Sequence, residues 1–250
     1  MPAPANLYTH HRFPGEIISH AVWRYFCGPL SHRDMEALLF VRGVIVSYEA
    51  IRQWCRKPGP QFTNQLRRRQ ARPGDKWPMD EVCLTSNKKR HYLWRAVDQD
   101  GHMLDILVQR RRNTQAAKTC FRTLLKGCQA VPRVIITDTL KHDGAAKREM
   151  LPDVEHHQSR SLNNRCEHAH RPTRQREQRM HALPSPGHAQ HFLSAYGPIA
   201  HHVRPRRHLL SASKSRQEMR NRFASWAEIT GAERVASRVS GRTSAACPRG

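Results

Sequence analysis

The stretch RVIITD, residues 133–138, decides how the rest of the chain is interpreted. Its β-branched run from Val134 to Thr137 is typical of a strand buried in the centre of a sheet. Asp138 follows directly and ends the strand. Because ligands bind outside the carboxyl ends of parallel strands, an acid at this position is a candidate for chemistry.

The segments on either side of this strand predict a mixed α/β fold. Residues 82–86, 92–97 and 103–108 are predicted to be strands, with Asp100-Gly101 as the hairpin turn between the last two. Residues 154–157 are predicted to form a further strand and residues 164–182 a very polar helix. Three meander strands followed by alternating helices and strands indicate a layered α/β architecture. One amphipathic helix is predicted from a continuous apolar face made of Ala116, Ala117, Cys120, Phe121, Leu124, Leu125 and Cys128.

The N-terminal part of the chain predicts a small all-α domain of three short helices. Apolar residues recur at helical spacing from Ile17 to Phe26, Ser31 and Asp34 form a pattern typical of a capping box, and Ser47 caps the third helix. Such an arrangement suggests a helix-turn-helix that reads a major groove, but a helical bundle with a solvated basic face fits the spacing equally well. The candidate DNA-binding residues here are Ser47, Tyr48, Glu49, Arg52, Gln53 and Arg56.

The predicted organisation has six segments. Residues 1–12 are expected to be a flexible arm, 13–57 the helix-turn-helix domain and 58–76 a basic linker. Residues 77–200 are expected to form the α/β core, 201–231 a basic segment with a helix near 215–229, and 232–250 a disordered tail. Within the linker, Arg67 and Arg68 are candidates for phosphate contacts, although a solvated charge run is the commoner meaning of such a stretch.

The charge of the chain constrains its partners. Its 43 Lys and Arg against 20 Asp and Glu give a net charge of +23, which favours a polyanionic partner. A basic protein without such a partner and an RNA-binding protein are the alternatives, and an aromatic content of only 7% weakens the second.

The cysteines argue for a reducing compartment. Seven of them are scattered without a C-x-x-C pair, which opposes both a disulfide framework and a structural zinc site. Cys166, His168 and His170 form a C-x-H-x-H cluster, but one helix cannot point all three to one side. With no apolar run long enough to span a membrane, we expect a cytoplasmic, nucleoid-associated protein.

Acidic residues are scarce, so their positions are informative. Asp80 opens the first core strand, Asp138 ends the buried strand, and Glu167 lies in the first turn of the polar helix. Carboxylates that converge from different elements can hold Mg²⁺ for phosphoryl transfer. Each also has a structural explanation, since strand-end acids hydrogen-bond turns and Glu167 could complete a capping box with Asn164. Glu81, Asp98, Asp105 and Asp143 are alternative acids.

A resemblance selects among these alternatives. From about residue 12 to residue 231 the chain resembles an insertion-sequence transposase of the DDE class, in the IS-six family. The stretches that carry the resemblance include SHRDMEALLFVRGVIVSYEAIRQW, RPGDKWPMDEV, KRHYLWRAVDQDGHMLDILVQRRRN, VPRVIITD and LNNRCEHAHRPTRQRE.

The resemblance implies a helix-turn-helix followed by an RNase H-like core, a mixed β-sheet flanked by helices. It implies Asp80, Asp138 and Glu167 as catalytic, metal-binding residues, with two Mg²⁺ or Mn²⁺ ions as cofactors. It further implies that His170, Arg171 and Arg174 hold DNA near Glu167. The implied partner is double-stranded DNA, both the terminal inverted repeats and the target, which the transposase cleaves and joins as a homodimer or higher oligomer.

The sequence also departs from the family at several positions. Thr139 stands where lysine is usual, Pro78 where His is common, and Lys88 where an Asn-Gly turn would have glycine. Pro58 and Leu183-Pro184 are further departures. They keep open a second hypothesis, a relic that binds DNA without catalysis. An RNase H-like nuclease acting on RNA or hybrids fits the core but leaves the helix-turn-helix without a role.

Overall fold

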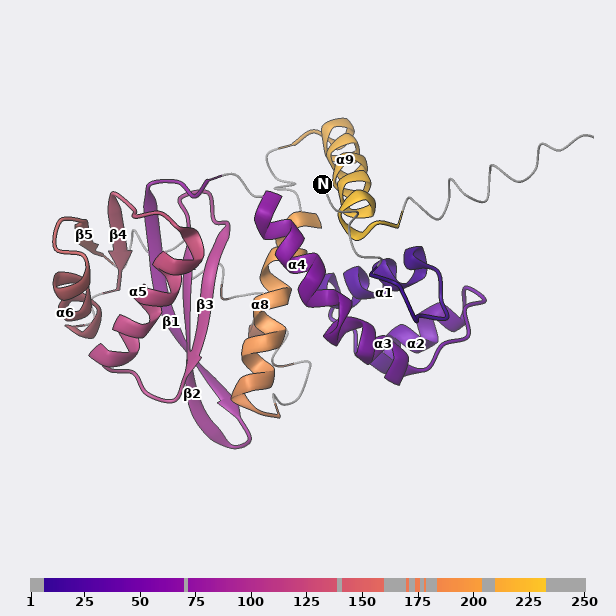
Figure 1. The fold of residues 1–250 in the computed structure, drawn as a ribbon, viewed down its shortest axis with the longest axis horizontal. Helices are drawn as coiled ribbons and strands as arrows, with labels where there is room; N and C mark the ends of the chain where they lie inside the picture. The colour runs from indigo at the N-terminus through magenta and orange to yellow at the C-terminus, as the bar shows by residue number, and fades with distance from the viewer. Residues whose placement is uncertain are drawn as a thin grey trace, which may run out of the picture. The chain divides into compact units, whose positions relative to one another are not determined.

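The computed structural model describes residues 7–69, 72–138, 141–159, 170, 174–175, 178, 184–203 and 210–232. The chain divides into two compact units, an α/β unit of residues 70–198 and a helical unit of residues 1–69 with 199–250 (Figure 1). Most of the polar helix expected over 164–182, including Glu167 and Arg171, lies outside the described residues. The tail after Ala232 does so as well.

The α/β unit is built on a five-stranded mixed sheet. Strands β1 (Lys76–Ser86), β2 (Lys89–Val97) and β3 (Met103–Gln109) form an antiparallel meander. Strand β4 (Val134–Thr137) runs parallel to β1, and β5 (Glu155–Gln158) runs parallel to β4. The resulting order, β3-β2-β1-β4-β5, confirms the predicted RNase H-like sheet.

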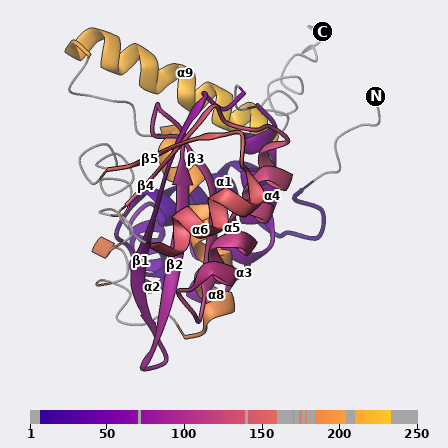
Figure 2. The same cartoon turned by 90° about the vertical axis from the view of Figure 1, so that its left-hand side faces the viewer.

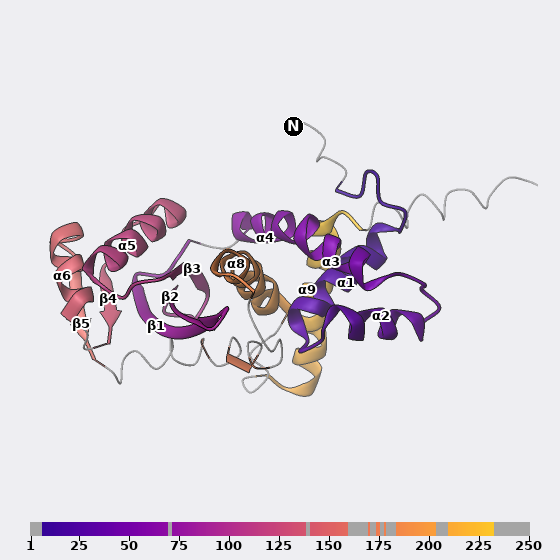
Figure 3. The ribbon, with the colours of Figure 1, turned by 90° about the horizontal axis from the view of Figure 1, so that it is seen from below.

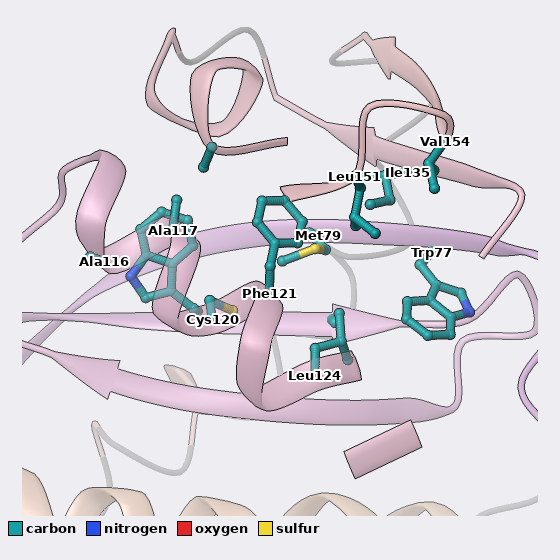
Figure 4. Close-up of a cluster of buried hydrophobic side chains, with 13 residues drawn as sticks. Trp77, Met79, Ala116, Ala117, Cys120, Phe121, Leu124, Ile135, Leu151 and Val154 are labelled. Atoms are coloured by element: carbon teal, nitrogen blue, oxygen red, sulfur yellow. The ribbon is translucent and has the colours of Figure 1, made fainter. Parts of the chain in front are cut away.

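One face of this sheet is buried under two helices. Helices α5 (Thr114–Cys128) and α6 (Lys141–Met150) lie side by side over it (Figure 2). The apolar face predicted for α5 provides Phe121 and Leu124, which pack with Trp77 and Met79 of β1 (Figure 4). Because these β1 residues alternate along the strand, the residues between them face away from this core.

Strand β1 is longer than the sequence predicted. It begins at Lys76 instead of Val82, so Asp80 lies inside the strand and does not open it. The physical reason is the parallel pairing with β4, which engages residues 76–78 although Pro78 interrupts the apolar pattern there. That pairing is long-range, so no local signal in the sequence indicates it.

A glutamine protects the free edge of the sheet. Gln190 lies on helix α8 (Pro186–Val203) and accepts a hydrogen bond from the Val108 backbone N–H at 2.7 Å. Its amide nitrogen donates to the Ile106 carbonyl at 3.0 Å, so one side chain pairs the edge as a neighbouring strand would. Satisfying these groups limits edge-to-edge association of the sheet.

The helical unit begins with the three helices that the sequence predicted. They are α1 (Gly15–Cys27), α2 (His32–Phe40) and α3 (Tyr48–Arg56). The capping box of Ser31 and Asp34 is present in both directions, and the Ser47 hydroxyl accepts a hydrogen bond from the Ala50 N–H. Gly43, in the connection from α2 to α3, has a φ of +77° that favours glycine.

A fourth helix replaces the first part of the segment predicted to be a linker. Helix α4 (Pro58–Arg69) begins with proline at a position where its missing N–H costs nothing. It buries Phe62 and Leu66. The aromatic partner of Phe62 is Trp226 of helix α9 (Ala212–Thr230), with ring centroids 5.5 Å apart. A linker was predicted because the positive charge of residues 67–69 was given more weight than the apolar residues Phe62 and Leu66. The aromatic partner of Phe62 is distant in sequence, so no local pattern indicated the helix.

Helix α9 belongs to the packing of this unit. It contacts α1 and α4 and runs beside α1 in Figure 3. Trp23 of α1 packs edge-on against Phe223, with centroids 4.7 Å apart. Tyr8, in the segment expected to be a flexible arm, packs near Phe62 and covers Gly15 so closely that a Cβ there would lie 2.5 Å from its ring. The N-terminal helices and the C-terminal helix therefore share one core.

The turn between β1 and β2 requires left-handed backbone at two residues that are not glycine. Ser86 pairs with Lys89, so Asn87 and Lys88 form a two-residue turn in which both have positive φ, 50° and 59°. Left-handed backbone costs an ordinary L-residue about 1–2 kcal/mol, and glycine avoids that cost.

We expect Lys88→Gly to raise the free energy of unfolding by up to about 1 kcal/mol, because it removes the left-handed strain. Lys89→Gly is the matched control and should lower it by about 0.5–1 kcal/mol, because Lys89 has extended backbone in β2. Urea unfolding of both variants measures the difference. Two changes of the same sign would contradict the assigned turn.

Candidate active site and DNA-reading helix

The parallel pairing of β1 and β4 brings two acids together. Pro78 pairs with Ile136, and the same register continued by two residues places Asp80 beside Asp138. Neighbouring strands lie about 4.8 Å apart, so both carboxyl groups are within reach of one site. Asp80 is 15% exposed in its side chain, and Asp138 is half-buried.

These two acids lie on the face of the sheet opposite α5. Trp77, Met79 and Ile135 belong to the core beneath α5, and the alternation of side chains turns Asp80 and Asp138 to the other side. The face that carries the two acids also has buried apolar residues farther along the strands, among them Val82, Leu93 and Ile106. Glu167, the third predicted acid, lies outside the described residues.

Arg95 is a site residue that sequence reasoning missed. It lies opposite Asp80 in the β1–β2 register and is only 5% exposed. A guanidinium buried opposite Asp80 offsets part of the negative charge of that carboxylate. The signal was available in the sequence: a two-residue turn at Asn87-Lys88 fixes which residue of β2 faces Asp80.

His170 is buried against Asp80. Its side chain is 3% exposed, and its Nε2 lies 3.5 Å from Asp80 Oδ2. Burial, with the positive charges of Arg95 and Arg174, lowers the pKa of His170 to about 3. The sequence predicted that His170 would share the helical face of Glu167 and hold DNA, which stays a prediction; its side chain is buried next to Asp80. Arg174, predicted for the same role, is exposed.

The alternative acids of this unit have other partners. Glu81 is buried and forms an ion pair with Arg112, on the side of the sheet that carries Trp94. Asp98, Asp100 and His102 have ligand atoms within 4.8 Å of one another and could hold a metal ion. The Asp98 carboxylate, however, already accepts hydrogen bonds from the backbone N–H groups of Asp100 and His102, which accounts for this cluster as the predicted hairpin turn.

A cavity at the opposite end of the parallel strands is a separate feature. It has a volume of about 690 Å³ and lies at the amino ends of β1, β4 and β5. Its charged lining balances Lys76 and Arg133 against Asp100 and Glu155. Because the two signs cancel, the cavity has no net attraction for phosphate.

The exposed face of α3 is organised by one acid. The Arg52 guanidinium donates two hydrogen bonds to Glu49, at 2.7 and 2.6 Å, and Gln53 donates a third at 3.3 Å. Tyr48 is 42% exposed and lies under Arg33, whose guanidinium carbon is 5.3 Å from the ring centroid. Arg56 and Gln53 are exposed. Arg67 and Arg68, predicted on a linker, lie in the last turn of α4.

Comparison with known proteins identifies the family of this chain. The family model of the IS240-type transposase "DDE domain" matches residues 74–206. The transposase for the insertion sequence-like element IS431mec of Staphylococcus aureus is 29% identical over 184 residues, which cover 71% of this chain and 81% of the relative. The transposase for insertion sequence element IS257 in transposon Tn4003 of S. aureus matches with the same identity and coverage.

Two solved structures give weaker matches. The catalytic core domain of HTLV-2 integrase with magnesium is 15% identical, has a TM-score of 0.30 and covers 38% of this chain and 68% of that chain. The simian T-cell lymphotropic virus intasome is 13% identical, has a TM-score of 0.38 and covers 78% of this chain and 64% of that chain.

The DDE-domain match over residues 74–206 defines the class of this chain, a polynucleotidyl-transferring enzyme. The chain belongs to the DDE transposases, in the IS-six family, and is a DNA transposase. Among the described residues, no helix is both long and apolar enough to cross a membrane.

The Glu49 carboxyl tests the arrangement on α3. Hydrogen bonds from Arg52 and then Gln53 lower its pKa from 4.5 to about 2. Because they favour the charged form, the stabilisation from this pairing is present above the ordinary pKa and is lost as pH falls toward 2. In Arg52→Gln the Glu49 pKa should return toward its ordinary value, as measured by NMR titration of the side-chain carboxyl.

Arg56→Gln is the matched control for this titration. Arg56 affects Glu49 only through its charge, as the last and smallest cause of the shift, so the midpoint should remain low in this variant. An unchanged midpoint in Arg52→Gln would show that the ion pair does not form.

Proposed function

We propose that this transposase binds the terminal inverted repeats of an insertion sequence, cleaves the 3′ ends and joins them to target DNA at Asp80, Asp138 and Glu167. The observation that carries the proposal is the parallel register, which sets Asp80 beside Asp138 on the sheet face away from α5. Glu167 is included because of the family resemblance.

The donor set fits divalent metal ions. Carboxylate oxygens are the ligands that Mg²⁺ and Mn²⁺ prefer, and two adjoining acids repel each other unless positive charge lies near them. Two Mg²⁺ or Mn²⁺ ions would therefore be held by Asp80, Asp138 and Glu167. When bound, such ions activate the attacking oxygen and stabilise the leaving oxygen of a phosphodiester.

The chain's own cations complete the site. Arg95 is buried opposite Asp80 and adds positive charge beside that carboxylate. Arg174 is exposed near His170 and would contact DNA phosphates, as would Arg171. No nucleotide cofactor is needed, because the nucleophile is water or a DNA hydroxyl.

Recognition of the inverted repeats is assigned to α3. Its exposed residues would enter the major groove, with Arg52 held at a fixed orientation by Glu49. Joining two element ends requires them to be held together, so we expect a homodimer or a higher oligomer on DNA. The net charge of +23 favours binding to both repeat and target DNA.

Replacing either acid tests the catalytic assignment. Asp80→Asn and Asp138→Asn should each reduce strand transfer by more than about a hundredfold, because each removes a carboxylate that holds the metal ions. A gel assay with Mg²⁺ or Mn²⁺ and DNA carrying the element's ends measures the joining.

Glu81→Gln is the matched control, since Glu81 neighbours Asp80 in sequence but pairs with Arg112 on the other face. It should retain joining in the fraction that folds. Undiminished joining by Asp80→Asn would exclude this site.

Replacing Arg52 tests the reading helix. Arg52→Ala should lower the preference for the cognate repeat over random DNA by about 1–3 kcal/mol, because a bidentate base contact is lost. Arg68→Ala, an exposed position of α4, should weaken binding to both DNAs equally, as a phosphate contact does. Competition binding at fixed salt measures both, and equal losses for Arg52→Ala would assign that residue to the phosphates.

A second candidate function is sequence-specific DNA binding without catalysis. It is favoured by Lys88, whose left-handed backbone retains the strain that glycine would relieve, and by Thr139 in place of lysine. Binding of the repeats without any joining by the wild type would select this function.

A further inference from the structure

His170 presents an unusual group to the proposed active site. The residue is 2% exposed, and within the described part of the chain neither of its ring nitrogens has a hydrogen-bond partner. Buried polar atoms in proteins are nearly always paired, because losing water without a replacement costs about 1–3 kcal/mol each. An orphaned imidazole nitrogen that faces an acid therefore points to a missing ligand.

The geometry indicates what kind of ligand is missing. Nε2 lies 3.5 Å from Asp80 Oδ2, which is longer than an ordinary hydrogen bond between these atoms. Two ligands of one ion lie about this far apart, since metal–nitrogen and metal–oxygen bonds are each about 2.0–2.2 Å. The same two atoms could also share a bridging water, which makes a competing prediction.

We propose that His170 Nε2 is a ligand of the ion that Asp80 holds, so that this metal site is a mixed nitrogen and oxygen site. This inference rests on the proposed function, because it takes Asp80 as a metal ligand. Imidazole suits transition metals better than Mg²⁺, which prefers oxygen. The site should therefore favour Mn²⁺ over Mg²⁺ more strongly than a site made of carboxylates alone.

The burial of His170 supports a ligand role over a DNA contact. The His170 side chain is 3% exposed, so the ring does not reach a DNA backbone, whereas the Asp80 side chain is 15% exposed. Arg95 and Arg174 already supply positive charge near His170. Contact with DNA therefore does not require another cation at position 170.

Electron paramagnetic resonance of Mn²⁺ bound to the full chain tests the proposal without any DNA. With histidine labelled with ¹⁵N, pulsed spectra should show a directly bound histidine nitrogen in the wild type. That coupling should disappear in both His170→Gln and Asp80→Asn. In His170→Gln the dissociation constant for Mn²⁺ should rise at least about tenfold, with a smaller rise for Mg²⁺.

Two controls separate this site from other histidines and from misfolding. His191→Gln, at an exposed position of α8, should keep both the coupling and the affinity. His170→Asn, a smaller change, should match His170→Gln. The wild-type spectrum by itself requires no variant to fold, so absence of the coupling overturns the proposal even if His170→Gln is unstable.

The outcomes distinguish this inference from the proposed function. Mn²⁺ that binds in an Asp80-dependent way without a nitrogen coupling overturns the role of His170, favours the bridging water and leaves the catalytic assignment standing. Mn²⁺ binding that is indifferent to Asp80→Asn overturns both. A coupling that persists in His170→Gln assigns the nitrogen to another histidine and overturns the inference.

Discussion

The site depends on one pairing, the parallel alignment of β1 with β4. Strand β4 has only four residues, and its register determines which residue of β1 adjoins Asp138. A slip of β1 by one residue would turn every β1 side chain to the opposite face of the sheet. The buried cluster of Trp77, Met79 and Ile135 opposes that slip, because Trp77 and Met79 would leave the core under α5 and Asp80 would turn into it. Packing on one face thus fixes chemistry on the other.

The sequence predicted the parts of the fold that local signals specify. The helices with polar caps, the Asp100-Gly101 hairpin and the apolar face of α5 were all identified from spacing. Each of these features is produced by residues within a few positions of one another. The sequence pattern that predicts the feature therefore contains the residues that cause it. The family resemblance added the identity of the core and selected Asp80 and Asp138 among several acids, which topology by itself could not do.

Features that depend on distant partners were not predicted. Helix α4 was taken for a linker because Phe62 finds Trp226 only in the folded unit. The start of β1 was placed too late because its first residues pair with β4. The burial of His170 was not predicted, because helical spacing shows which residues share a face but not whether that face turns to water or to a sheet. The position of Arg95 could have been predicted, because the two-residue turn between β1 and β2 sets which residue of β2 lies opposite Asp80.

The abundance of cations in this chain has two physical consequences that work together. A surplus of arginine and lysine attracts DNA phosphates over distances set by salt, whatever the sequence of the DNA. Inside the α/β unit, the same residue type has another place: Arg95 is buried opposite Asp80, beside the two acids' strands. Exposed cations therefore attract a polyanion to the protein, and a buried one lies opposite an acid of the proposed site. Glu49 shows the converse on α3, where one acid holds two side chains of a basic helix in place. Because acids are few in this chain, each acid that pairs with a cation fixes the position of a side chain that would otherwise be free to turn toward solvent.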